Sequence, residues 1–140
     1  MIKFWDMSKK KSKTSVLNNI VLKKAKNKHD AKDWPAAFVG AEYYTIRHFA
    51  KTHYISKNSL TSMLNHQLLT ELKKLGNIGD KVNGYSVGYC AEVYAANKVL
   101  ATSNVSINIK QIRFSPTIRP RTMQMLKYCS NCLTIFNVKN

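Results

Sequence analysis

The chain has 140 residues, of which 44% are apolar, enough for one domain with a buried core. It contains no run of about 18 apolar residues, so no membrane span is predicted, and residues 1–6 lack the features of a signal peptide. Lysine and arginine number 23 against seven aspartates and glutamates, which gives a net charge of +16. This excess favours an anionic partner: nucleic acid first, an acidic protein second and a membrane surface third.

Two parts of the chain differ in charge: residues 1–33 are predicted to be a basic arm and residues 34–140 the main domain. The arm holds ten lysines, many of them within 9–13 and 23–28. We expect it to be either a solvated, partly disordered extension or a tether for phosphates. Apolar residues at helical spacing predict a short amphipathic helix within it, at Val16–Val21.

Helices are expected in the first half of the main domain. Trp34-Pro35 marks its start, because the residue before a proline is pushed away from helical angles. We expect a helix over Ala41–Tyr54, while the β-branched and aromatic content leaves a strand open as an alternative at Ala36–Thr45. Leucines then recur every three to four residues and predict a longer helix, with Ser59 at its N-cap and Gly76 at its end.

The second half alternates between extended and helical patterns. A short extended piece at Tyr85–Tyr89 precedes a helix at Ala91–Ala101 that is apolar on nearly all sides and therefore buried. Apolar and polar residues alternate over Val105–Ile112, which is the period of a half-buried strand. Pro116 and Pro120 break the chain after it.

All three cysteines lie in two short motifs, Cys90-Ala91-Glu92 and Cys129-Ser130-Asn131-Cys132. An odd number of cysteines does not make a disulfide framework, and a Cys-Xaa-Xaa-Cys pair without a secretory signal indicates metal or redox chemistry. We expect Cys90, Cys129 and Cys132 to bind Zn²⁺ and to leave its fourth position for water, as in catalytic zinc sites. Cysteines at helix starts would also be favoured as thiolates by the helix dipole.

Glu92 is the last carboxylate side chain in the sequence, and residues 93–140 carry seven lysines and arginines but no acid. It follows Cys90 by two residues in the first turn of a predicted helix, where it can face a metal-bound water without ligating the metal. We predict that Glu92 is the general acid/base. Zinc would supply a hydroxide nucleophile, and the glutamate would carry the proton that the water gives up.

Other interpretations of the cysteines remain open. One of the four histidines, all upstream of the cysteines, could complete a closed and therefore structural zinc site. Cys129 and Cys132 could instead form a redox pair. Cys90, considered alone, could be a small buried apolar residue at a helix start.

The two motifs resemble those of the zinc-dependent deaminase superfamily, and most closely those of the YwqJ-like bacterial toxin deaminases. The resemblance spans residues 84–136 and rests on three segments: Gly88-Tyr89-Cys90-Ala91-Glu92-Val93, Ile118-Arg119-Pro120-Arg121-Thr122 and Cys129-Ser130-Asn131-Cys132. The chain departs from the family pattern at Tyr128, where a proline usually precedes the cysteine pair. The resemblance implies a cytidine-deaminase-like α/β fold, a mixed sheet flanked by helices in three layers, with zinc at the starts of two helices.

The resemblance also implies a function: hydrolytic deamination of cytosine to uracil in single-stranded DNA or RNA. The module would belong to a larger secreted or delivered toxin that acts in the cytoplasm of a target cell. We expect a monomer with a nucleic-acid substrate, an acidic immunity protein as a further partner, and no membrane partner. Arg119 and Arg121 are candidates to offset the charge of three thiolates, and Tyr128 to stack on a base. A free nucleoside or nucleotide deaminase and a non-enzymatic, zinc-stabilised nucleic-acid-binding module are the alternatives.

Overall fold

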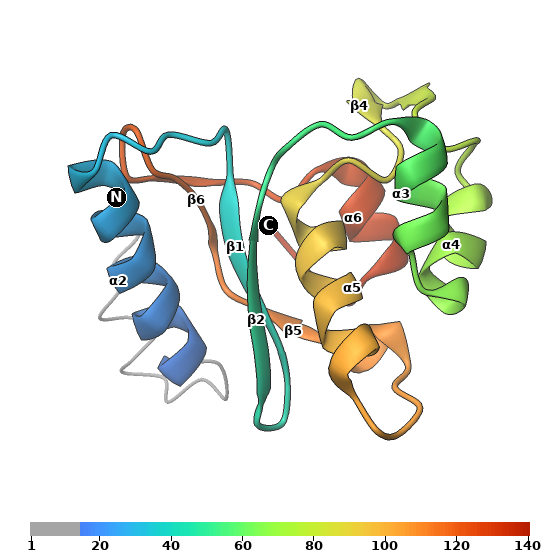
Figure 1. Cartoon of the computed structure of the whole chain (residues 1–140), viewed down its shortest axis with the longest axis horizontal. Coiled ribbons are helices and arrows are strands. Elements are labelled where there is room, and N and C mark those ends of the chain that lie inside the picture. The colour runs from blue at the N-terminus through green and yellow to red at the C-terminus, as the bar shows by residue number, and fades with distance from the viewer. Residues whose placement is uncertain (1–14) are drawn as a thin grey trace.

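The computed structural model describes residues 15–140, in which a five-stranded sheet lies between two layers of helices (Figure 1). One layer is helix α2, and the other contains α5 with the shorter helices around it. The predicted three-layer α/β class is thus confirmed, whereas the lysines of 9–13 lie outside the described residues. The helices are α2 (Ser15–Asp30), α3 (Lys57–Met63), α4 (His66–Lys73), α5 (Ala91–Thr102) and α6 (Ser130–Ile135).

The sheet has the strand order β2-β1-β6-β7, with β5 also paired to β1, and a separate hairpin joins β3 to β4. Each of these pairs is antiparallel. The pairs β1–β2, β3–β4 and β6–β7 are hairpins, and β5 and β6 both lie antiparallel to β1. In this detail the sheet differs from the mixed one that the resemblance implies. The strands are β1 (Phe38–Tyr43), β2 (Ile46–Lys51), β3 (Lys81–Val82), β4 (Tyr85–Ser86), β5 (Arg113–Phe114), β6 (Thr117–Arg119) and β7 (Gln124–Leu126).

Strand β1 is buried on both faces because a helical layer covers each of them. Val39 on one face belongs to the large core that contains α5, and Phe38 on the other packs with Val21 of α2. A Cβ added to Gly40 would lie 2.8 Å from Leu17 Cδ1, so the missing side chain lets α2 approach the sheet. Helix α2, within the predicted basic arm, is therefore packed on the sheet through fully buried residues.

The helix predicted over Ala41–Tyr54 is wrong, and the strand alternative at Ala36–Thr45 agrees with the first half of a β-hairpin. Tyr44 turns the chain between β1 and β2 with a φ of 52°. The apolar spacing was misleading because a strand buried on both faces needs no alternation of apolar and polar residues. β-branched and aromatic residues were the better signal here.

The predicted leucine-rich helix is divided into α3 and α4. Asn65 interrupts it with non-helical backbone angles (φ −56°, ψ 142°), and its backbone N–H donates to Asn97 Oδ1 of α5 at 2.7 Å. Ser56, rather than the predicted Ser59, is the N-cap of α3, and its Oγ accepts from the Ser59 backbone N–H at 3.1 Å. Leucines of both short helices belong to the same buried core as the residues of α5.

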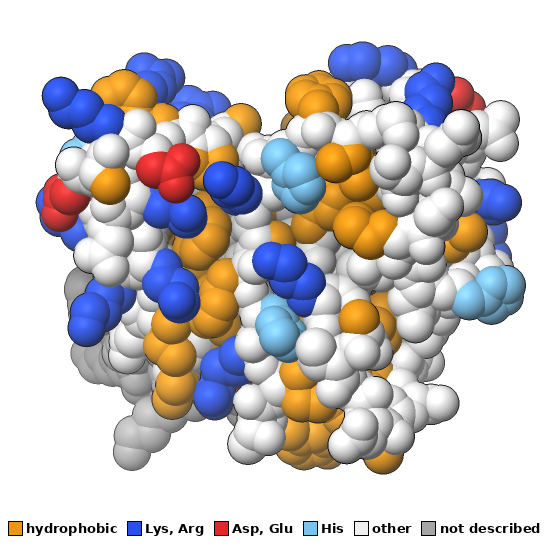
Figure 2. Space-filling view, viewed as in Figure 1, with side chains coloured by type: hydrophobic (Ala, Val, Ile, Leu, Met, Phe, Trp, Pro, Cys, Tyr) orange, Lys and Arg blue, Asp and Glu red, His pale blue; other side chains and the backbone are white. Residues whose placement is uncertain are grey.

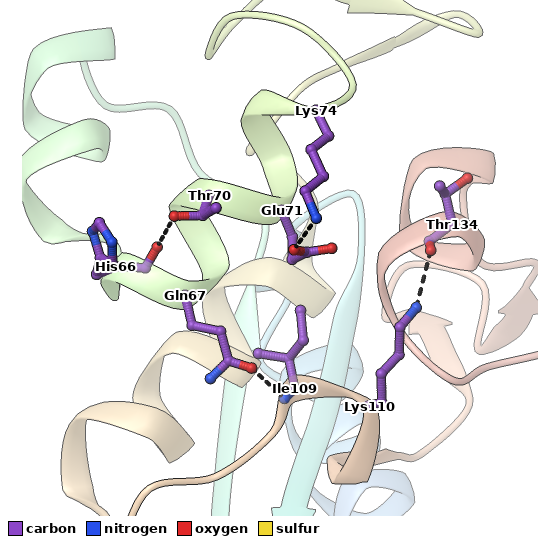
Figure 3. A network of polar contacts seen from close by, with 8 residues as sticks. All are labelled: His66, Gln67, Thr70, Glu71, Lys74, Ile109, Lys110 and Thr134. Carbon is purple, nitrogen blue, oxygen red and sulfur yellow. Dashed lines mark hydrogen bonds and ion pairs between the residues drawn. The ribbon is translucent and has the colours of Figure 1, made fainter.

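The strand predicted over Val105–Ile112 is also wrong, although its alternation correctly marks Ile107 and Ile109 as buried. The segment ends in a single 3₁₀ turn, η1 (Ile109–Gln111). The side-chain amide of Gln67 in α4 bonds two backbone groups that a neighbouring strand would otherwise pair. Its Nε2 donates to the Ile107 carbonyl at 2.7 Å, and its Oε1 accepts from the Ile109 N–H at 2.9 Å. Figure 3 shows the contact to Ile109 from close by.

Replacing Gln67 by alanine should lower the free energy of unfolding by about 1–2 kcal/mol, because two backbone groups lose their partner. Chemical denaturation followed by circular dichroism measures the change. The control is Gln124→Ala, at the exposed first residue of β7, for which we expect a change below about 0.5 kcal/mol. Equal stability of Gln67→Ala and the unmodified chain would contradict the bridging role.

Candidate metal centre and active-site cavity

Cys90 is the residue at which an extended segment becomes helix α5. It is the N-cap, with φ −79° and ψ 147°, and its thiol makes no capping bond. Gly88, two residues earlier, has a φ of +91°, and a Cβ there would lie 3.2 Å from side-chain atoms of Leu60 and Ile78. Glycine is therefore required for the chain to pass over this core and present Cys90 at the helix start.

Cys129 and Cys132 lie at the start of α6 and are both buried. Cys129 is the N-cap, and its Sγ accepts a hydrogen bond from the Cys132 backbone N–H at 3.4 Å. One helical turn separates the two residues, so both thiols point to the same side. The expected placement of both cysteine motifs at helix starts is confirmed.

The fold brings the three cysteines together, with all sulfurs within 4.8 Å of one another. The thiols are free, and the Sγ atoms of Cys90 and Cys129 lie 2.9 Å apart in a hydrogen bond. Hydrogen bonds from Cys132 and Cys90 to its sulfur lower the pKa of Cys129. In a tetrahedral zinc site with Zn–S bonds of about 2.3 Å, two sulfurs lie about 3.8 Å apart. This separation is shorter than the 4.8 Å within which the three sulfurs lie here. The cluster could therefore hold a metal ion such as zinc.

No histidine or carboxylate of residues 15–140 joins the cysteine cluster. His29 Nδ1 contacts the Pro120 carbonyl at 2.7 Å, and His53 stacks on Tyr94 with ring centroids 4.6 Å apart. A metal ion held here would thus have three protein ligands. That number is typical of catalytic zinc, whereas structural zinc has four.

Glu92 is buried beside the cluster without belonging to it, with only 4% of its surface exposed. Its Oε2 accepts a hydrogen bond from Thr117 Oγ1 of β6 at 2.9 Å. Burial raises the pKa of Glu92, and the Thr117 hydrogen bond opposes that shift in part. A carboxyl group with a raised pKa is suited to exchanging a proton near neutral pH.

A cavity of about 480 Å³ gives solvent access to the cluster, and Cys90, Glu92 and Cys129 are part of its wall. Tyrosines and cations make up much of the remaining wall: Tyr54, Tyr85, Tyr89, Lys81, Arg119 and Lys127. A hollow of about 450 Å³ beside Asn65–Gln67 lacks both cysteine and carboxylate, so it offers no comparable chemistry. On the molecular face in Figure 2, lysine and arginine clearly outnumber acidic side chains.

Of the side chains expected to contact substrate, only Arg119 lines the cavity. Arg121 is exposed in the turn after β6 and is not part of the wall. Tyr128 is half-buried, and its hydroxyl donates to the Ser115 carbonyl at 2.7 Å. This bond directs the hydroxyl into the protein, and Tyr128 is absent from the cavity wall.

Two residues of the site carried no recognisable signal in the sequence. Thr117 follows a proline and belongs to no motif, and its partner Glu92 is 25 residues earlier in the chain. Tyr54 lies just after β2, in a segment predicted to be helical. Only the sheet brings Thr117 beside α5, so neither residue could be found without the fold.

Comparison of the chain with models of known protein families, with curated proteins and with solved structures finds no match. The functional argument therefore depends on the cysteine cluster, on Glu92 and on the cavity. The deaminase resemblance is carried by the motif residues alone.

Replacement of any one of the three cysteines by serine should reduce bound zinc from about one ion per chain to a small fraction of that, because each removes one of only three thiolates. Elemental analysis of the purified protein after reconstitution and dialysis measures the content. Ser130→Ala, in the same turn, is the control and should keep its zinc. Full zinc content in any variant that lacks one of the three cysteines would contradict this assignment.

Proposed function

We propose that the protein is a zinc-dependent deaminase that hydrolyses cytosine to uracil in single-stranded nucleic acid. The supporting observation is the buried carboxyl of Glu92 beside a three-cysteine cluster, in a cavity that reaches solvent. The cluster has no fourth ligand among the described residues, which favours a catalytic over a structural metal. A redox pair of Cys129 and Cys132 would leave both Cys90 and Glu92 without a role.

Three thiolates, from Cys90, Cys129 and Cys132, would hold the metal. Bound zinc supplies Lewis acidity and lowers the pKa of coordinated water. The carboxylate of Glu92 is held by Thr117 and faces the cavity without competing as a ligand. Water is excluded from most of its surface, so the proton that it carries is not readily lost to solvent.

The role of Glu92 in the proposed reaction is to transfer a proton. As the anion it takes a proton from the attacking water, and as the acid it gives that proton to the amino nitrogen that leaves C4 of cytosine. One water is consumed, the C4–N bond breaks, and uracil and ammonia are released. Burial raises the pKa of Glu92 from its usual acidic value, which is the direction that suits a general acid/base.

Charge supports a polynucleotide as the substrate. The net charge is +16, and the cavity wall contains Lys81, Arg119 and Lys127 with Glu92 as its one carboxylate. Such a wall attracts phosphates. The same charge suits an acidic immunity protein, consistent with the role of a delivered toxin module inside a target cell. Within residues 15–140, every helix is too short or too polar to span a bilayer.

Glu92→Gln should lower deamination of a cytosine-containing oligonucleotide at least about 100-fold, because the amide cannot carry the proton. Zinc content should be unchanged, since Glu92 is not a ligand. The control is Glu71→Gln on α4, which removes a glutamate outside the cavity wall. Mass spectrometry of the oligonucleotide measures the reaction.

Sequencing of DNA and RNA from cells that express the protein or its Glu92→Gln variant identifies the substrate. C-to-T changes in DNA, or C-to-U changes in RNA, should be present only with the unmodified chain. Conversion of free cytidine without changes in either polymer would favour the nucleoside deaminase. Toxicity that survives Glu92→Gln would contradict the deaminase altogether.

Thr117→Val should move the acidic limb of the pH profile of kcat/KM to higher pH. The Thr117 hydroxyl lowers the pKa of Glu92 by stabilising its anion, so its removal raises that pKa and the active anion forms only at higher pH. Thr117→Ser keeps the donor and should keep the profile. An unshifted limb in Thr117→Val would contradict the assignment of this limb to Glu92.

A further inference from the structure

The cavity wall contains an aromatic ring that neither the metal cluster nor Glu92 explains. Tyr54 lies between β2 and α3 and is 88% exposed, although its ring centroid is 5.6 Å from that of Tyr89. It belongs to the same wall as Cys90 and Glu92. Most of its ring therefore faces water at the opening of the site, where a flat apolar ligand could cover it.

A second exposed tyrosine is held close to the cysteine turn. Tyr85 of β4 is 46% exposed and also lines the cavity. Its carbonyl accepts a hydrogen bond at 3.4 Å from Nδ2 of Asn131, the buried residue between Cys129 and Cys132 in sequence. The β3–β4 hairpin is thereby linked to the metal cluster, and Tyr85 has a defined position in the wall.

Cations come to the same cavity from separate segments. Lys81 is in β3, Arg119 in β6 and Lys127 directly after β7. Exposed aromatic faces among lysines and arginines are typical of surfaces that bind single-stranded nucleic acid, where rings stack on bases and cations contact phosphates. Stacking depends little on the identity of the base.

We propose that Tyr54 stacks on the nucleotide next to the one whose base enters the cavity, so that the site selects a single-stranded polynucleotide over a free nucleotide. A free nucleotide can fill the cavity and still leave the exposed face of Tyr54 in water. In a polymer the neighbouring base lies outside the cavity and covers that face. The proposal rests on the proposed function in one respect, which is that a cytosine base enters the cavity. Stacking on Tyr54 itself does not require catalysis.

Binding measurements on the zinc-loaded Glu92→Gln protein test this without turnover. The probes are a fluorescent twelve-nucleotide DNA with one cytosine among thymines, the corresponding RNA with uracils, and unlabelled CMP as competitor. Tyr54→Ala in this background should weaken binding of at least one oligonucleotide roughly tenfold, while the affinity for CMP stays within about twofold. Tyr54→Phe keeps the ring and should bind as the parent does.

The control is Tyr44→Ala. Tyr44 is 69% exposed in the β1–β2 turn, at the end of β1 away from the cavity residues Ala36 and Ala37. Its removal should leave both affinities unchanged. Lys127→Ala should reduce the salt dependence of oligonucleotide binding, which Tyr54→Ala should not.

Two results would overturn the stacking proposal: parental oligonucleotide affinity in Tyr54→Ala, or oligonucleotides that bind no more tightly than CMP. Either result is compatible with a protein that deaminates free CMP, so neither result would contradict the proposed deamination reaction. Conversely, a tenfold effect of Tyr54→Ala in a protein without deaminase activity would support the stacking role and overturn the reaction alone.

Discussion

Burial of helix α5 is the constraint on which the other parts of the structure depend. The helix is buried from Ala91 to Asn97 and again at Val99, so its polar side chains must find partners inside the protein. Asn97 pairs with the chain between α3 and α4, and the Tyr94 hydroxyl donates to the His53 carbonyl at 3.0 Å. Glu92 pairs with Thr117 of β6. Helix α5 thus determines the positions of three segments distant in sequence, and two of them border the cavity.

The two buried glutamates, Glu42 and Glu92, have side-chain partners of different charge. Glu42 of β1, only 1% exposed, pairs with Arg47 at 2.9 Å and with Arg113 at 3.4 Å. These cations compensate the buried charge and connect three strands. Glu92 has a neutral hydroxyl as its side-chain partner. A buried carboxyl without a cation is costly as an anion and therefore ready to accept a proton, a property that serves the proposed reaction but not stability.

The cysteine cluster adds a second coupling between distant segments. Cys90 and Cys129 are 39 residues apart, and each begins a different helix. A metal ion bound between them would link α5 to α6, so metal affinity and folding stability would contribute to each other. Cys90 and Cys129 line a cavity that also has cationic and aromatic residues in its wall, so the same link would also position Glu92 and the cluster relative to the proposed polynucleotide substrate.

The α/β class followed from the resemblance of the motifs to a known family. The sequence by itself determined the cysteine motifs, their placement at two helix starts and the buried helix that follows Cys90. These features depend on local spacing and on strongly apolar segments, which neighbours in sequence largely specify. Only the tertiary structure decided the β1–β2 hairpin, the break at Asn65 and the irregular course of the chain at Ile107, because each depends on a partner far along the chain. The same holds for the site: the Glu92–Thr117 bond and the position of Tyr54 exist because the sheet and α5 pack together, and residue spacing contains no information on that packing.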